Sequence, residues 1–167
     1  MRPIYGIVAA ILPLAVLAQS NRTYSLEKFE FEGGPEAWGN DCESLSMNCG
    51  TAVIEEDNDY HKEGKLMRYL KEKLYSLPPD RVYPSGKHIA CYLYSHGPHG
   101  FCLFFENLPR GTNHTVGEAF NALMALERAG KNGHCSHRCG RGWNTKWEHG
   151  YLKLDYVRKS CKGVCKY

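Results

Sequence analysis

The sequence predicts an α+β fold in which helices pack on one face of an antiparallel sheet. Segments with the hydrophobic period of a helix alternate along the chain with short segments that have the two-residue period of a strand. The chain has 167 residues, of which 43% are apolar and 8 are cysteines. It therefore has enough apolar side chains for a core and too few cysteines for a fold held by disulfides alone. The net charge of +3 argues against nucleic acid as the partner.

The first residues have the pattern of a secretory signal peptide over 1–18. A charged residue precedes an apolar run from Ile4 to Leu17, and the expected cleavage site follows Ala18. The run is short for a membrane span, and an uncleaved anchor is the alternative. We expect a secreted, extracellular protein with an N-terminal extension, 19–41, and a domain, 42–167.

Secretion determines how the cysteines are interpreted. In an oxidising compartment an even set is expected to form disulfides, although spacing does not decide the pairing. The eight are Cys42, Cys49, Cys91, Cys102, Cys135, Cys139, Cys161 and Cys165. A zinc site over His134–Cys139 is the alternative, but each cysteine used by a metal would leave another unpaired. We expect four disulfides, no metal and no cofactor. Two sequons fit this compartment and make Asn21 and Asn113 candidate glycosylation sites.

The first elements of the chain include one clear helix. The alternation over 29–32 suits a short strand or loosely ordered chain equally well. Between Glu63 and Leu77, leucines such as Leu66, Leu70 and Leu74 recur at helical spacing, and two prolines follow. We therefore expect a helix over 63–77.

A hairpin is expected next. His88–Tyr94 alternates in the manner of a strand, His96–Gly100 has turn residues, and Phe101–Glu106 is apolar enough for a central strand.

A second helix is expected to begin at Thr115 and to end at Gly130. Thr115 with Glu118 three residues later is the signature of a capping box. The segment 131–147 is rich in glycine, histidine and cysteine and is expected to be a loop, and 151–158 is expected to be the last strand.

Charge is unevenly distributed along the chain. Residues 19–65 carry 4 basic and 11 acidic side chains, whereas residues 130–167 carry 9 basic and 2 acidic ones. The basic end either contacts an acidic partner or folds against the acidic half. The candidate target-binding cations are Lys87, Arg138, Arg141, Lys146, Lys153, Arg158 and Lys159.

Catalytic motifs are weak. The sequence has no metalloprotease, serine-hydrolase or paired-carboxylate motif. A small secreted hydrolase, such as a ribonuclease, is the alternative function, and it would need two histidines and a cation in one cleft. The histidines considered for it are His88, His96, His99, His134, His137 and His149.

Four motifs in order resemble the fungal killer-toxin family of the smut-virus (KP-four) type. They are Cys42–Cys49, the central pair Ile89-Ala90-Cys91 with Phe101–Phe105, the loop Gly133–Gly140 and the closing strand Gly150–Cys161. The match covers most of the chain from Cys42 onward. Two departures are the three residues between the loop cysteines and the extra Cys165.

The resemblance implies an α/β sandwich with two antiparallel helices on one face of an antiparallel sheet. It also implies a secreted, non-enzymatic toxin or effector that antagonises a microbe or a plant host. The implied target is a membrane or cell-surface protein such as a calcium channel, and the protein is expected to be a monomer. The family's basic residue before the central cysteine is not matched, because Ile89 stands two positions before Cys91 and the nearest lysine is Lys87.

The resemblance further implies particular disulfides. These are Cys42–Cys135, Cys49–Cys139 and Cys91–Cys161, and the even count then leaves Cys102–Cys165. A swapped alternative, Cys91–Cys165 with Cys102–Cys161, stays open because few residues separate the last two cysteines.

Overall fold

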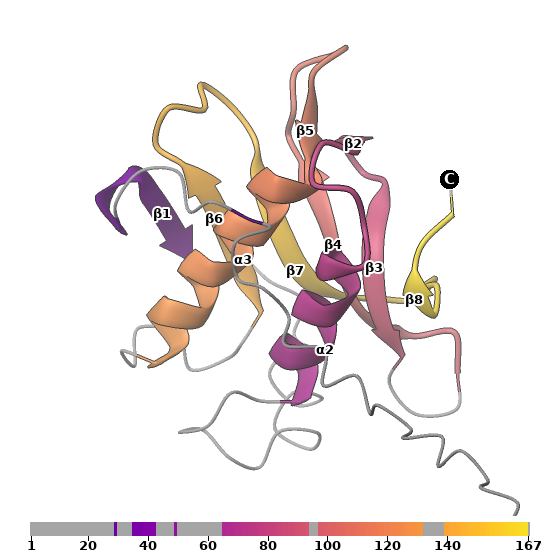
Figure 1. Ribbon diagram of the computed structural model, residues 1–167. Helices are drawn as coiled ribbons and strands as arrows, with labels where there is room; N and C mark the ends of the chain where they lie inside the picture. The colour runs from indigo at the N-terminus through magenta and orange to yellow at the C-terminus, as the bar shows by residue number, and fades with distance from the viewer. Residues whose placement is uncertain are drawn as a thin grey trace, which may run out of the picture.

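The computed structural model describes residues 29, 35–42, 49, 65–93, 97–131 and 139–166 (Figure 1). They contain a six-stranded antiparallel sheet in the order β1-β6-β7-β4-β3-β8 and a two-stranded sheet of β2 and β5. The strands are β1 Trp38–Asp41, β2 Val82–Pro84, β3 His88–Leu93, β4 Gly100–Glu106, β5 Asn113–Thr115, β6 Gly140–Asn144, β7 Tyr151–Val157 and β8 Gly163–Val164. A short 3-10 helix, Pro35–Ala37, precedes β1.

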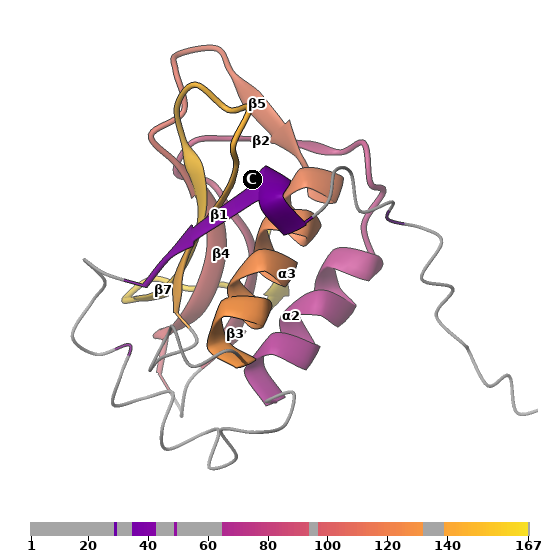
Figure 2. The ribbon, with the colours of Figure 1, turned by 90° about the vertical axis from the view of Figure 1, so that its left-hand side faces the viewer.

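Two helices, α2 Lys65–Tyr75 and α3 Val116–Lys131, cover the same face of the large sheet (Figure 2). They run antiparallel, and the start of α3 is tied to the segment after α2 because the Gly117 N–H donates to the Pro79 carbonyl over 2.9 Å. The predicted α+β class, with two antiparallel helices on one face of an antiparallel sheet, is therefore confirmed.

The core lies between the helices and the sheet. From α2 it contains leucines at the predicted helical spacing, and from the central strands it contains every second side chain. Its members include Leu66, Leu70, Leu74, Phe101, Leu103, Phe105, Leu152 and Leu154. Phe29 is buried, and its ring stacks on Phe120 with centroids 4.6 Å apart. Residues 30–32 and the predicted signal peptide lie outside the described residues.

Five of the described strands, β1, β2, β5, β6 and β8, were not expected from the sequence. The predicted loop 131–147 contains β6, and the predicted extension 19–41 contains β1, which pairs with β6 at the edge of the sheet. β6 includes Gly140 and Gly142, which face the helices without a side chain and so hide the two-residue pattern of a strand. A Cβ on Gly142 would collide with the Ala122 carbonyl of α3, so the glycine lets the helix approach the sheet.

Candidate functional site

The large sheet has a second face, opposite α2 and α3, which we call the open face. Figure 2 shows both described helices on one side of the sheet. Because side chains alternate along strands, the residues between the core positions of β7 and β4 belong to the open face. The strand registers continue this face over five strands and align one residue from each in a row: Asp41, Arg141, Lys153, Phe104 and His88.

Ion pairs connect the charged residues of this row to one another and to their neighbours. Arg141 Nη1 lies 3.7 Å from Asp41 Oδ2. The Arg141 guanidinium carbon lies 4.7 Å from the centroid of the Tyr151 ring. Lys153 Nζ lies 3.4 Å from Glu106 Oε2 and 3.2 Å from Asp155 Oδ2. The Lys153 side chain is only 14% exposed, so it acts mainly within the protein.

Tyr151 completes this network. Its hydroxyl donates to Glu106 Oε2 over 2.7 Å, and its ring lies beneath Arg141. Burial and the hydrogen bond to Glu106 raise the pKa of Tyr151 above its usual value, so the phenol keeps its proton at neutral pH. The open face therefore holds a largely self-neutralised set of charges.

The predicted target-binding cations fall into two groups. Arg141 and Lys153 are the two half-buried members that form the ion pairs above. The exposed members are Lys87, Lys146, Arg158 and Lys159, whereas Arg138 lies outside the described residues. Lys87 precedes β3, and Lys146 lies between β6 and β7. These two lysines are therefore in other segments than Arg158 and Lys159, which follow β7.

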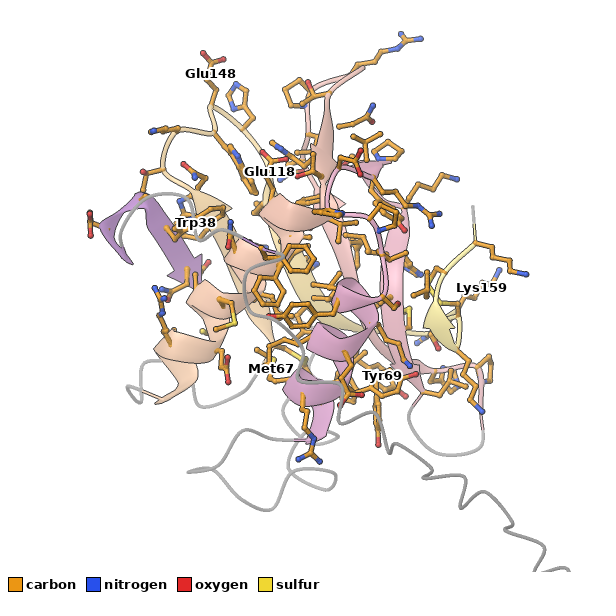
Figure 3. All side chains as sticks on the ribbon, in the orientation of Figure 1. Trp38, Met67, Tyr69, Glu118, Glu148 and Lys159 are labelled. Atoms are coloured by element: carbon orange, nitrogen blue, oxygen red, sulfur yellow. A yellow bond between two sulfur atoms is a disulfide. The ribbon has the colours of Figure 1, made fainter. Side chains whose placement is uncertain are left out.

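Arg158 and Lys159, which were predicted, belong to a larger group whose other two members, Lys162 and Lys166, were not. Lys162 and Lys166 are also exposed, and within the described part of the chain no ion pair involves any of these four cations. We call them the C-terminal basic segment. Figure 3 shows Lys159 beside β8, far from the acidic Glu148 of the β6–β7 connection. The sequence feature that could have identified Lys162 and Lys166 is the excess of basic residues after residue 130, since both are among the nine found there.

Three contacts hold this segment in place. The Ser160 N–H donates to the Pro98 carbonyl over 2.9 Å, and the Cys165 N–H donates to the Ile89 carbonyl over 3.0 Å. A disulfide joins Cys161 to Cys165 around β8. The basic side chains are thus presented by an ordered segment that is anchored to the sheet.

The disulfides confirm part of the expected pairing. Cys49 is bonded to Cys139, as the family resemblance implied. Cys42 is disulfide-bonded, and its expected partner Cys135 lies outside the described residues.

The other two expected pairs, Cys91–Cys161 and Cys102–Cys165, are wrong in this structure. The swapped alternative, Cys91–Cys165 with Cys102–Cys161, is not the observed pairing either. Cys91 is bonded to Cys102, and Cys161 to Cys165. The register explains the first bond, because Cys91 and Cys102 are directly opposite on adjacent strands with Cα atoms 4.1 Å apart. The second closes a short turn, so each cysteine has its nearest partner in its own hairpin or turn.

Among the residues that the structure describes, two groups of side chains have metal-like spacing, His88 with Cys91 and Cys165, and Asp155 with Cys49 and Cys139. All four of these cysteines are disulfide-bonded. A disulfide sulfur is not the thiolate that binds zinc, so neither group offers a thiolate ligand in this state.

The described histidines considered for a hydrolase have different surroundings. The His88 ring packs against Phe104, the His99 ring stacks on Tyr156, and His149 is exposed between β6 and β7. Burial lowers the pKa of His88 below its usual value. His96, His134 and His137 lie outside the described residues. Of the candidate glycosylation sites, Asn113 is exposed on β5, and Asn21 lies outside the described residues.

Searches with models of protein families and among curated proteins find no match to this chain. Among the described residues, neither helix has the length and hydropathy needed to span a membrane.

Proposed function

We propose that this chain is a secreted, non-enzymatic toxin or effector that binds a target on another cell through its C-terminal basic segment. The observation that carries the proposal is the presence of four exposed cations within residues 158–166, none of which forms an ion pair with a described residue. A segment that is already ordered loses little conformational freedom when it binds, which favours a role in recognition.

The chemistry of the segment indicates an anionic partner. Lysine and arginine side chains attract acidic protein surfaces and anionic membranes over about 10 Å at moderate ionic strength. The resemblance to killer toxins supplies the class of target, a membrane protein such as a calcium channel of a competing fungus or of a plant host. The signal peptide, the sequons and the disulfides fit a protein that works outside the cell that makes it.

The fold supports a binding role in a second way. Cys49–Cys139 connects residues 90 positions apart and holds them beside the start of β6. Binding residues commonly lie on loops and chain ends that a rigid scaffold positions. The sheet, its two covering helices and this disulfide are such a scaffold for the segment that follows β7.

The test applies purified mature protein to fungal cells and to plant tissue. Growth, calcium uptake and host responses are measured with the native protein and with Lys159→Glu/Lys162→Glu. The double variant is expected to lose most of the activity and to keep its circular dichroism spectrum, because both side chains are exposed.

The matched control is Lys87→Glu/Lys146→Glu, which makes the same change of charge at two exposed positions elsewhere. It is expected to keep its activity. An equal loss in both variants would show that only net charge matters, and no response in either organism would contradict the proposed function.

A further inference from the structure

Four cysteines form a cluster on the open face of the sheet, which we call the open-face cysteine cluster. They come from β3, from β4 and from the two sides of β8, and they pack with Phe104. The members are Cys91, Cys102, Cys161 and Cys165. Two disulfides are therefore packed side by side, separate from the main core.

The two disulfides are close enough to exchange partners. Cys91 Sγ lies 3.5 Å from Cys165 Sγ, although these atoms belong to different disulfides and are 74 residues apart in sequence. Exchange requires a thiolate to reach a disulfide sulfur, and here the sulfur atoms are already in van der Waals contact.

We propose that the open-face cysteine cluster is a thiol–disulfide exchange site, which a small thiol of the glutathione class enters at Cys161. The exchanged product has the other two pairs, Cys91–Cys165 and Cys102–Cys161. Cys161 is the entry point because it is half-exposed, whereas the remaining three members are buried.

The exchange balances in three steps. The small thiolate attacks Cys161 Sγ, the Cys161–Cys165 bond breaks, and Cys165 leaves as a thiolate. Cys165 Sγ then attacks Cys91 Sγ, and Cys102 leaves as a thiolate. Finally, Cys102 Sγ attacks Cys161 Sγ and releases the small thiol. Two disulfides exist before and after, so the thiol is regenerated and no oxidant or reductant is consumed.

His88 is placed to accept a proton in this reaction. One of its ring nitrogens and the sulfur atoms of Cys91 and Cys165 all lie within 4.8 Å of one another. Burial lowers the pKa of His88, which keeps its ring neutral at physiological pH although it also weakens the ring as a base. A ring nitrogen is therefore available to accept a proton or a hydrogen bond from a Cys165 thiol. A thiolate, and not a thiol, is the attacking species.

The exchange would change how the C-terminal basic segment is attached. In the observed pairing, the two disulfides of the cluster close short loops, with separations of 11 and 4 residues. In the exchanged pairing, two disulfides would join the segment around β8 to the β3–β4 hairpin. This chemistry does not depend on which target the protein binds.

Trypsin separates the two pairings by mass. Cleavage after lysine and arginine gives the peptides 88–110, 160–162 and 163–166, and the first of them contains both Cys91 and Cys102. In the observed pairing, 88–110 is released alone and the two short peptides are joined. In the exchanged pairing, all three peptides form one species. Further cleavage by chymotrypsin at Tyr92 and Phe101 then shows whether Cys91 is joined to 163–166.

The experiment incubates the native protein with a substoichiometric amount of glutathione, quenches it with acid and maps the peptides. We expect the three-peptide species to appear, with Cys91 joined to 163–166. Unchanged peptides after prolonged incubation, or Cys91 joined to 160–162, would overturn the proposal.

A pair of single variants tests the key step without added thiol. Cys161→Ser frees the Cys165 thiol, and the peptide 88–110 is expected to become cross-linked to 163–166 with a new thiol on Cys102. Cys165→Ser is the matched control, in which Cys91–Cys102 is expected to persist. Thiols are labelled with N-ethylmaleimide in denaturant after the acid quench. Label only on Cys165 in the first variant would overturn the proposal.

His88→Gln tests the proton acceptor in the native cysteine background. It is expected to slow the appearance of the three-peptide species and to leave its final fraction unchanged. If His88 had only a structural role, the substitution would change the final fraction of the three-peptide species and would not change the forward rate constant of exchange.

Discussion

Thr115 and Glu118 exchange hydrogen bonds across the first turn of α3. The Thr115 N–H donates to Glu118 Oε2 over 2.7 Å, and the Glu118 N–H donates to Thr115 Oγ1 over 3.1 Å. This confirms the capping box that the sequence predicted. Glu118 Oε1 also bonds to the Nδ1 atom of His114 over 3.0 Å, which connects the start of the helix to β5.

Replacing Thr115 by alanine is expected to lower the free energy of unfolding by about 1 kcal/mol, because one helix N–H loses its acceptor. Urea unfolding followed by circular dichroism measures the change. Thr112→Ala is the control, since the described hydrogen bond of Thr112 uses its backbone N–H. Its effect is expected to stay below about 0.5 kcal/mol. Equal effects in the two variants would contradict the capping role.

Stability is expected to fall in acid in a way that depends on Glu118. Burial acts to raise the pKa of Glu118, but the hydrogen bonds from His114 and Thr115 outweigh it and hold the pKa below its ordinary value of 4.5. The stabilisation is therefore complete above pH 4.5 and is lost as the pH falls through the lower, folded-state pKa. In urea unfolding over this pH range, the free energy of unfolding should fall less steeply with decreasing pH in Glu118→Gln than in the native protein. Identical pH dependence in the two proteins would show that Glu118 is not responsible for the loss.

Lys71 and Glu127 join the two helices. Lys71 Nζ lies 3.3 Å from Glu127 Oε2, and the carboxylate side chain is only 5% exposed. Lys71→Met is expected to destabilise the protein by about 2 kcal/mol, because a buried carboxylate loses a cationic partner. Lys71→Met/Glu127→Met should cost less than the sum of the two single changes.

Glu72→Gln is the control for this cycle, since Glu72 is exposed on the same helix. Chemical unfolding of all four variants measures the coupling. Strict additivity would show that the two side chains do not interact.

Gly142→Ala is expected to destabilise the protein by about 2 kcal/mol or more, because its Cβ would collide with the Ala122 carbonyl and force α3 away from β6. Gly117→Ala is the matched comparison. Its Cβ would have ordinary contacts, the nearest 3.5 Å from the Pro79 carbonyl oxygen. That variant is expected to be neutral or stabilising by up to about 1 kcal/mol, since alanine favours helix more than glycine. Thermal unfolding separates the two, and the reverse order would contradict the packing.

Removing the long-range disulfide is expected to cost much more than removing the short one. Cys49–Cys139 spans 90 residues, whereas Cys161–Cys165 spans 4. Loop-closure entropy predicts that Cys49→Ser/Cys139→Ser is less stable than Cys161→Ser/Cys165→Ser by about 3 kcal/mol. Guanidinium unfolding of the two double variants measures the difference. Equal midpoints would show that the long loop is already compact in the unfolded chain.

Elements with a clear pattern were predictable from local sequence. The leucines of α2 recur at helical spacing because one face of the helix is buried, and the cap of α3 depends on residues only three positions apart. β6 was not predictable, because Gly140 and Gly142 leave no alternation, and β1 is a strand only because β6 pairs with it.

The candidate site shows the same division. The excess of basic residues after residue 130 was visible in the sequence, but which of them point to solvent was not. Arg141 and Lys153 look the same as Lys159 in a charge count. The register of β6, β7 and β4 places the first two beside Asp41 and Glu106, whereas Lys159 lies beyond the end of β7.

Local pattern was enough to predict the α+β class, the two helices and the central hairpin, and the family resemblance implied the Cys49–Cys139 pair. The remaining disulfides and the ion pairs of the open face follow from how the strands pair. Hydrophobic period and capping depend on residues a few positions apart, whereas the partner of Cys91 depends on strand register. That register places Cys102 directly opposite Cys91 and also places Cys165 3.5 Å from it.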